Sequence, residues 1–190
     1  MMNADFLVFQ AKSFYNAYIA IEQLNLACEH PLLYYIPMLV NGAFSIEITL
    51  KAILTKNQIE YKKEHNLLLL FQLLPDSFQA ELYDHLLEKA PEYKNFQKCA
   101  EELLLVSNAF VDWRYPFEGK PAPAFDARFL SAFANAAIWT MFSHYNVDLV
   151  PSSEKDKPDE EIEEMFQKNR ERSKEDIVNY LQKKSKERHT

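Results

Sequence analysis

A charged residue stands where a helical pattern calls for an apolar one. The residues of one predicted helix face recur at steps of three or four: Phe96, Ala100, Leu103, Ser107 and Phe110. Arg114 is the next member of this row, at the centre of the apolar stripe. An unpaired buried guanidinium costs too much free energy to persist, so we expect a carboxylate partner nearby. A guanidinium can also bind a carboxylate or phosphate ligand through two hydrogen bonds.

A second predicted helix carries complementary charges. Its apolar row contains Leu39, Ala43, Ile46, Leu50, Ile53 and Leu54. Glu47 and Lys51 fall inside the same arc, although an i,i+4 ion pair on an open helix surface is worth only roughly 0.2–0.5 kcal/mol. We therefore predict that Glu47 meets Arg114 across the two helices, with Lys51 and Glu118 at the edge of one polar network. That network is either purely structural or part of a pocket that also contacts a ligand.

The elements that position these residues are predicted to be helices. The 190 residues include only two glycines, and 48% are hydrophobic, without the Val/Thr alternation of strands. Prolines separate the helical segments. The expected elements are helices over about 4–28 and 38–57, a short helix after Asn66, one holding Phe78, Leu82 and Leu86, a long one from Pro91 to near Tyr115, and one over about 126–145. Residues 1–150 should thus form an all-α, up-and-down bundle of about five to six helices.

Several local features refine this prediction. Asn66 stands where an N-cap is needed, and Asp76 or Ser77 can cap the next helix. The first helix is expected to turn one apolar face inward: Phe6, Phe9, Phe14, Ala17, Ile21 and Leu24.

The segment 151–190 differs in composition from the rest. It holds 21 of the 49 charged residues, and Ser173-x-x-Asp176 is a plausible capping box for a last helix. We expect a charged helical tail that is either mobile or docked on a partner protein, because its thin apolar stripes need another surface.

Several kinds of chemistry are excluded by composition. Neither a Rossmann fingerprint nor a P-loop can be written with Gly42 and Gly119 alone. The two cysteines are isolated, and no Cys or His pair has metal-ligand spacing, so we predict no metal and no cofactor. A net charge of −7 requires any nucleic-acid contact to be local. With no basic leader and no uncharged run of about 18 residues, we expect a cytoplasmic protein without membrane contacts.

Three segments together resemble the HEPN family (higher eukaryote and prokaryote nucleotide-binding domains). Residues 40–54, with Glu47 and then Leu50-Lys51-Ala52, resemble its Glu and Leu-Lys-Ala helix. His65-Asn66-Leu67 is similar to its His-Asp-Leu element, and Phe110 to Tyr115 with Glu118 to its Arg-Tyr-x-x-Glu segment. The similarity covers roughly residues 4–146 and leaves the tail outside.

The resemblance implies a helical bundle that is commonly a homodimer. It also implies a role in prokaryotic phage defence, toxin–antitoxin, stress or nucleotide-handling systems, and many members are metal-independent ribonucleases. The family positions matched here are Glu47, Lys51, His65, Arg114, Tyr115 and Glu118. The nuclease members carry a His four to six residues after the Arg, and no His follows Arg114 at that distance.

Three functions remain open at this point. The first is a HEPN-like binding or interaction module whose polar cluster organises a nucleotide or RNA site. The second is a ribonuclease with a rearranged site, in which His65 transfers protons and Arg114 stabilises the phosphorane charge. The third is a non-catalytic scaffold whose charges are structural and whose tail recruits a partner.

Overall fold

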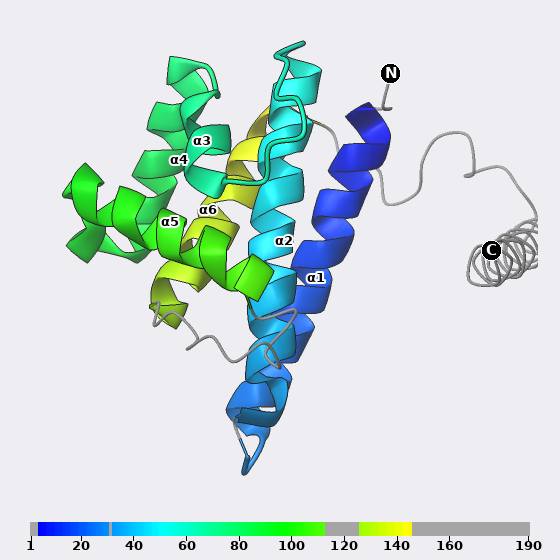
Figure 1. Ribbon diagram of the computed structural model, residues 1–190, viewed down its shortest axis with the longest axis vertical. Coiled ribbons are helices and arrows are strands. Elements are labelled where there is room, and N and C mark those ends of the chain that lie inside the picture. Colours follow the sequence, from blue (N-terminus) through cyan, green and yellow to red (C-terminus); the bar gives the residue numbers. More distant parts are fainter. Residues whose placement is uncertain (1–3, 31, 113–125, 146–190) are drawn as a thin grey trace, which may run out of the picture. The chain divides into compact units, whose positions relative to one another are not determined.

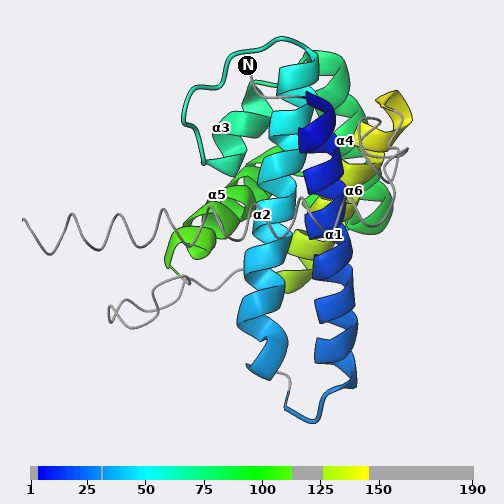
Figure 2. The same ribbon diagram turned by 90° about the vertical axis from the view of Figure 1, so that its right-hand side faces the viewer.

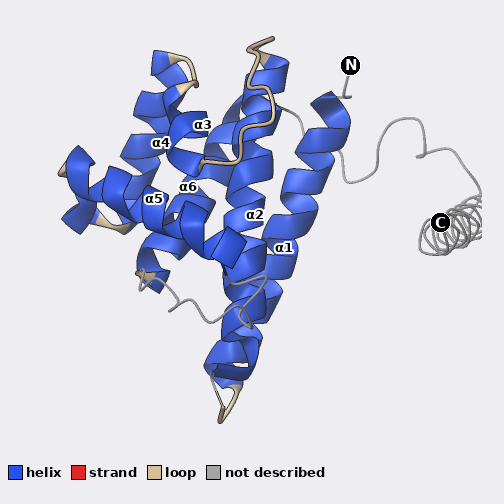
Figure 3. Ribbon diagram, in the orientation of Figure 1, coloured by secondary structure: helices blue, strands red, loops and turns tan. Residues whose placement is uncertain are grey.

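The computed structural model describes residues 4–30, 32–112 and 126–145, and every regular element in them is a helix (Figure 3). The elements are α1 (Ala4–Ala27), α2 (Leu32–Lys56), α3 (Leu67–Gln72), α4 (Asp76–Lys89), a 3₁₀ turn η1 (Pro91–Tyr93), α5 (Phe96–Asp112) and α6 (Ala127–His144). The predicted all-α helical bundle is confirmed. Arg114, Tyr115, Glu118 and the tail 151–190 lie outside the described residues.

The central element is α2, which contacts α1, α3, α5 and α6. It forms a long antiparallel hairpin with α1, and the tip of this hairpin projects past the other described helices (Figures 1 and 2). On the other side of α2, α5 runs obliquely across it, and α3 lies between α2 and α5. Residues 45–54 of α2 are consequently buried on all sides of the helix.

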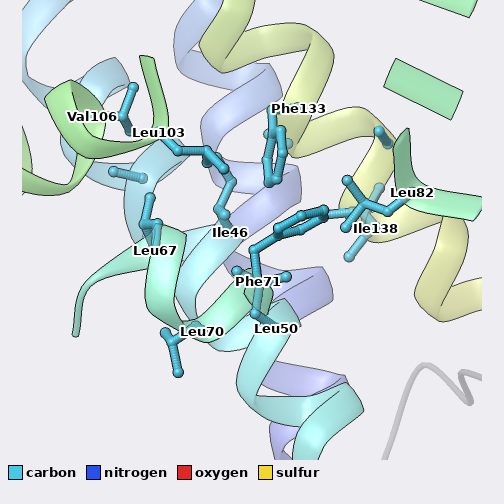
Figure 4. Close-up of a cluster of buried hydrophobic side chains, with 14 of the residues drawn as sticks. Ile46, Leu50, Leu67, Leu70, Phe71, Leu82, Leu103, Val106, Phe133 and Ile138 are labelled. Atoms are coloured by element: carbon cyan, nitrogen blue, oxygen red, sulfur yellow. The ribbon is translucent and has the colours of Figure 1, made fainter. Parts of the chain in front are cut away.

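The hydrophobic core forms around α2 and includes side chains of α3, α4, α5 and α6 (Figure 4). Phe71 of α3 lies at its centre and is 1% exposed, with its ring 6.0 Å from that of Phe133 in α6. Ile46 and Leu50 come from α2, and Leu82 comes from α4. The predicted inward row of α4 is confirmed, since Phe78, Leu82 and Leu86 are all buried. One apolar cluster therefore joins every described helix.

The inward face of α1 differs from the predicted one. Phe6 is 45% and Leu24 is 52% exposed, whereas the buried residues of the helix are Leu7, Val8, Ala11 and Tyr18. Large apolar residues occur on more than one side of α1, so periodicity alone does not select the buried face. The selection comes from Gly42 of α2, which leaves room for the ring of Tyr18.

The start of α2 also differs from the prediction. The helix begins at Leu32 instead of near Met38, and Pro37 lies inside it. A proline there removes one backbone hydrogen bond, usually at a cost of about 3 kcal/mol. Packing of the hairpin against α1 offsets this cost. In the same part of the helix, Asn41 Nδ2 donates to Pro37 O at 2.8 Å.

Of the two helix caps predicted within the described residues, the cap of α3 is confirmed and that of α4 is wrong, and the cap of α6 was not predicted. Asn66 is the N-cap of α3, where its side chain accepts from the amide of Leu69, and Asp126 caps α6. At α4 the cap is Pro75, without a side-chain hydrogen bond, and Asp76 is the first helical residue. The amide of Phe78, which a side-chain cap would bind, donates instead to the backbone carbonyl of Pro75 at 2.9 Å.

One described stretch, Leu33–Lys56, is long and apolar enough to cross a membrane by length and composition alone. The bundle buries 78% of its most apolar window. That burial is typical of the central helix of a helical bundle.

The close approach of α1, α2 and α6 depends on the missing side chain at Gly42. A Cβ there would lie 3.0 Å from Tyr18 Cδ2 and 3.1 Å from Leu130 Cδ2, both in buried residues. We expect Gly42→Val to lower the free energy of unfolding by about 2–3 kcal/mol, because overpacking forces the helices apart. Urea unfolding measures this loss. Ala20→Val, on the exposed side of α1, is the control and should change stability by less than about 1 kcal/mol.

Candidate functional site

The candidate site begins with two charged residues in the fully buried part of α2. Glu47 is 2% and Lys51 is 7% exposed. The hydroxyls of Ser45 and Thr49, in the same stretch, donate to backbone carbonyls of α2 itself. Such self-contained hydrogen bonds are not available to charged side chains, so Glu47 and Lys51 need partners from elsewhere or from each other.

A single carboxylate oxygen joins three residues. Glu47 Oε1 accepts from Lys51 Nζ at 2.7 Å and lies 2.9 Å from His65 Nδ1. Lys51 is one helical turn after Glu47, whereas His65 comes from the loop that precedes α3. The buried carboxylate therefore has one cationic partner and one imidazole partner, as the free-energy cost of its burial requires.

The loop holds His65 in place through its backbone. Glu64 Oε1 accepts from the amides of His65, at 2.8 Å, and Asn66, at 2.7 Å. Asn66 in turn caps α3, and the amide of Leu67 donates to Ser107 Oγ of α5 at 2.8 Å. His65 thus stands at a junction of α2, α3 and α5, with its backbone fixed on either side.

The imidazole of His65 has one engaged and one open nitrogen. A carboxylate facing Nδ1 favours the tautomer that carries the proton there, and Nε2 is left to act as acceptor. The side chain is 64% exposed, so Nε2 can reach a ligand, whereas the Glu47 side chain is only 3% exposed. A carboxylate that orients an imidazole in this way is the arrangement used in general acid–base catalysis.

Lys51 is shielded by the segment between α2 and α3. Its Nζ lies 5.7 Å from the centre of the Tyr61 ring, and the Tyr61 hydroxyl is 3.1 Å from Thr55 Oγ1. Gln58 and Lys62 adopt positive φ values of 58° and 46°, which non-glycine residues rarely do. The chain reverses sharply at these two residues and returns over Lys51 to His65.

Three of the six predicted site residues therefore meet, namely Glu47, Lys51 and His65. The predicted contact between Glu47 and Arg114 lies outside the described residues, as do Tyr115 and Glu118. The direct Glu47–His65 contact was not anticipated. A signal for it existed, because His65 comes immediately before the N-cap of a short apolar helix that must pack on α2.

A second polar cluster, around Glu81, was not predicted from the sequence. Glu81 of α4 accepts from the hydroxyl of Ser143 and lies 2.6 Å from His144 Nε2, both in α6. His85 Nε2 is 3.7 Å from the same carboxylate, and the His144 ring lies 4.3 Å from that of Phe78. The carboxylate stands between Ser and His, so this cluster joins α4 to α6 and is not a nucleophilic triad.

Comparison of the chain with protein-family models, curated proteins and solved structures gave no match. Among the described residues, no group of three or more His, Cys, Asp or Glu side chains is arranged to hold a metal ion.

The buried pair in α2 yields a stability prediction. Lys51→Met leaves the Glu47 carboxylate buried with one partner fewer, and we expect the free energy of unfolding to fall by about 3–5 kcal/mol. The double variant Glu47→Leu, Lys51→Met removes both charges and should recover most of this loss. His65→Ala should cost less than Lys51→Met, because water can take the place of the exposed imidazole at Glu47 Oε1. Urea unfolding at neutral pH measures the free energy of unfolding of each variant. A Lys51→Met protein as stable as the wild type would show that Lys51 does not stabilise the buried Glu47 carboxylate.

The α4–α6 junction yields a pH prediction. Burial raises the pKa of Glu81, but the hydrogen bonds from Ser143 and His144 and the nearby His charges lower it more, so the net shift is downward. A carboxyl with a lowered folded-state pKa stabilises the fold above its ordinary pKa, and this contribution disappears as the pH falls through the folded-state pKa. The stability difference between wild type and Glu81→Gln should therefore be largest near neutral pH and vanish once the pH has fallen below the lowered pKa of Glu81. Asp84→Asn, exposed on the same helix, should show no such pH-dependent difference.

Proposed function

We propose that this chain is a HEPN-like binding or interaction module in which the Glu47–Lys51–His65 cluster organises a nucleotide or RNA site. The observation that supports this most is the buried Glu47 carboxylate that holds an exposed imidazole. If Glu47 and Lys51 only stabilised the fold, they would not need a third residue, His65, that faces solvent. The cluster brings together the Glu-x-x-x-Lys helix and the His-Asn-Leu element, two of the three segments on which the family resemblance rests.

The surroundings of His65 suit a phosphate ligand. Lys62 and Lys63 are exposed and precede His65 within three residues, although the chain carries a net charge of −7. Glu60 and Glu64 flank the two lysines, but Glu64 Oε1 already accepts from the amides of His65 and Asn66, so the lysine side chains can contact a phosphate locally without a basic protein. A doubly protonated His65 would donate to the phosphate through Nε2, and Arg114, from the third family segment, would add a bidentate phosphate contact.

A second candidate function is metal-independent RNA cleavage. The observation that favours it is the 2.9 Å contact between Glu47 Oε1 and His65 Nδ1, which prepares Nε2 for proton transfer. Cleavage of RNA requires removal of a proton from the attacking 2′-hydroxyl and delivery of one to the leaving 5′-oxygen. One histidine can perform only one of these transfers in a single step, and no histidine follows Arg114 at the family spacing. Binding therefore stays the leading proposal.

The wider setting is proposed from the family resemblance. The chain would act in the cytoplasm as a homodimer, in a phage-defence or toxin–antitoxin system. The charged segment 151–190 would serve as an attachment site for a protein partner. Light scattering at micromolar protein concentration tests the dimer.

The proposed site predicts ligand-dependent stabilisation. Nucleotides or short mixed-sequence RNA should raise the melting temperature of the wild type, because a ligand that binds only the folded state adds to its stability. His65→Ala should reduce the shift by at least half. His30→Ala, in the exposed α1–α2 connection, should leave it unchanged. Equal shifts in all three proteins, or none in the wild type, would refute the nucleotide or RNA site.

Incubation of the same RNA with these proteins in the presence of a chelator separates the two candidate functions. No cleavage by either the wild type or His65→Ala is expected for a binding module. Cleavage by the wild type that His65→Ala abolishes, and Glu47→Gln weakens roughly 10²–10⁴-fold, would make the protein a ribonuclease.

A further inference from the structure

A pocket of about 620 Å³ lies away from the Glu47 cluster, between α1, α2 and α6. Small-molecule sites in proteins usually occupy about 300–1,000 Å³. Tyr35 and Met38 of α2 and Ala132 of α6 form its apolar wall, and Glu22 and Asn25 of α1 form its polar wall. None of these residues takes part in the proposed nucleotide or RNA site.

The polar wall presents hydrogen-bond acceptors that lack donors. Glu22 Oε1 accepts from the Tyr18 hydroxyl at 2.6 Å, and the structure shows no described donor to its second oxygen. Burial and the Glu22 carboxylate raise the pKa of Tyr18, so its hydroxyl remains a donor. Asn25 Oδ1 is buried without any hydrogen-bond partner. Because the last torsion of asparagine is broad, this amide can turn its oxygen toward the pocket without breaking a bond of that oxygen.

The end of α1 adds negative potential to the same wall. Asn25 and Leu26 lie at the end of this 24-residue helix, and its last turn contains no basic residue. The last carbonyls of a helix have no partners within it, and its C-terminal end behaves as a partial negative charge. A cation at this position would supply the charge that the helix itself lacks.

The two basic residues that line the pocket stand at its rim. The side chain of Arg128 is 81% exposed and pairs with Asp126 at 3.3 Å, so its charge is largely compensated. Lys89 is exposed at the end of α4, where water and salt screen it. The interior of the pocket is consequently acceptor-rich, with an aromatic ring and a thioether opposite the carboxylate.

We propose that this pocket binds an organic ammonium ion, a primary amine on an apolar body. The ammonium would donate to Glu22 and to Asn25 Oδ1, and the apolar body would lie against Tyr35 and Met38. A ligand with a carboxylate on the same apolar body would be repelled by Glu22 and by the partial negative charge at the end of α1.

The test uses three probes that share one phenylethyl body and differ in the head group: 2-phenylethylamine, 2-phenylethanol and 3-phenylpropanoate. Their binding to the full chain is followed by backbone amide NMR shifts and by calorimetry at low salt. We expect the amine to bind at least about tenfold more tightly than the carboxylate, with the alcohol in between, because only the amine brings a positive charge to its hydrogen bond with Glu22. The shifts should concentrate on the ends of α1 and α6.

Matched variants assign the interaction to the pocket. Glu22→Gln keeps an acceptor for Tyr18 and should weaken the amine about tenfold, whereas Glu88→Gln, the same charge change outside the pocket, should leave it within about twofold. Unchanged melting temperatures of both variants confirm that they fold. Failure of the amine to bind, equal affinity for all three probes, or preference for the carboxylate that Lys89→Gln abolishes would each overturn the proposal. None of these outcomes depends on the RNA or nucleotide experiments.

Discussion

The complete burial of one stretch of α2 governs the arrangement of its neighbours. Residues 45–54 face other helices on all sides, yet two of them are charged. Burying an ion without partners costs several kcal/mol, so the surrounding chain must bring hydrogen-bonding groups to that point. The segment after α2 does so: it turns back through two residues with positive φ and places His65 on the Glu47 carboxylate. The beginning of α3, and through Ser107 its attachment to α5, follow from that placement.

This arrangement gives the cluster two distinct sides. The Glu47 carboxylate is enclosed by the core and paired with Lys51, so a ligand cannot easily reach it or replace its partners. The imidazole side opens to solvent and carries the only group of the three that can exchange a proton with a bound molecule. A rigid, buried support beneath an exposed reactive group is what precise ligand positioning requires. The same division explains why stability and binding should respond to different substitutions in the cluster.

The two ends of the bundle use charge in different ways. At the α4–α6 junction Glu81 collects its partners from two helices at a partly exposed position, so its contribution depends on pH. At the end of α1, acceptors remain without donors beside an apolar wall. Unsatisfied polar atoms are rare in folded proteins and call for a specific explanation. A bound ammonium ion would explain the unsatisfied oxygen of Asn25. It would also explain why the last turn of α1 has no basic residue of its own.

The sequence by itself determined the helical class, the core row of α4, the Asn66 cap of α3 and the burial of Glu47 and Lys51. Each depends on local periodicity or capping chemistry, which neighbouring residues specify. Tertiary structure decided which face of α1 turns inward, because that choice depends on the space left by Gly42 on another helix. It also let α2 continue through Pro37, where hairpin packing outweighs a local penalty. Most of all, it brought His65 to Glu47 and His144 to Glu81 across 18 and 63 positions of the chain. Contacts of this kind depend on how two surfaces pack against each other. Helical periodicity predicts which face of a helix is buried, but not which residue of another element lies against it.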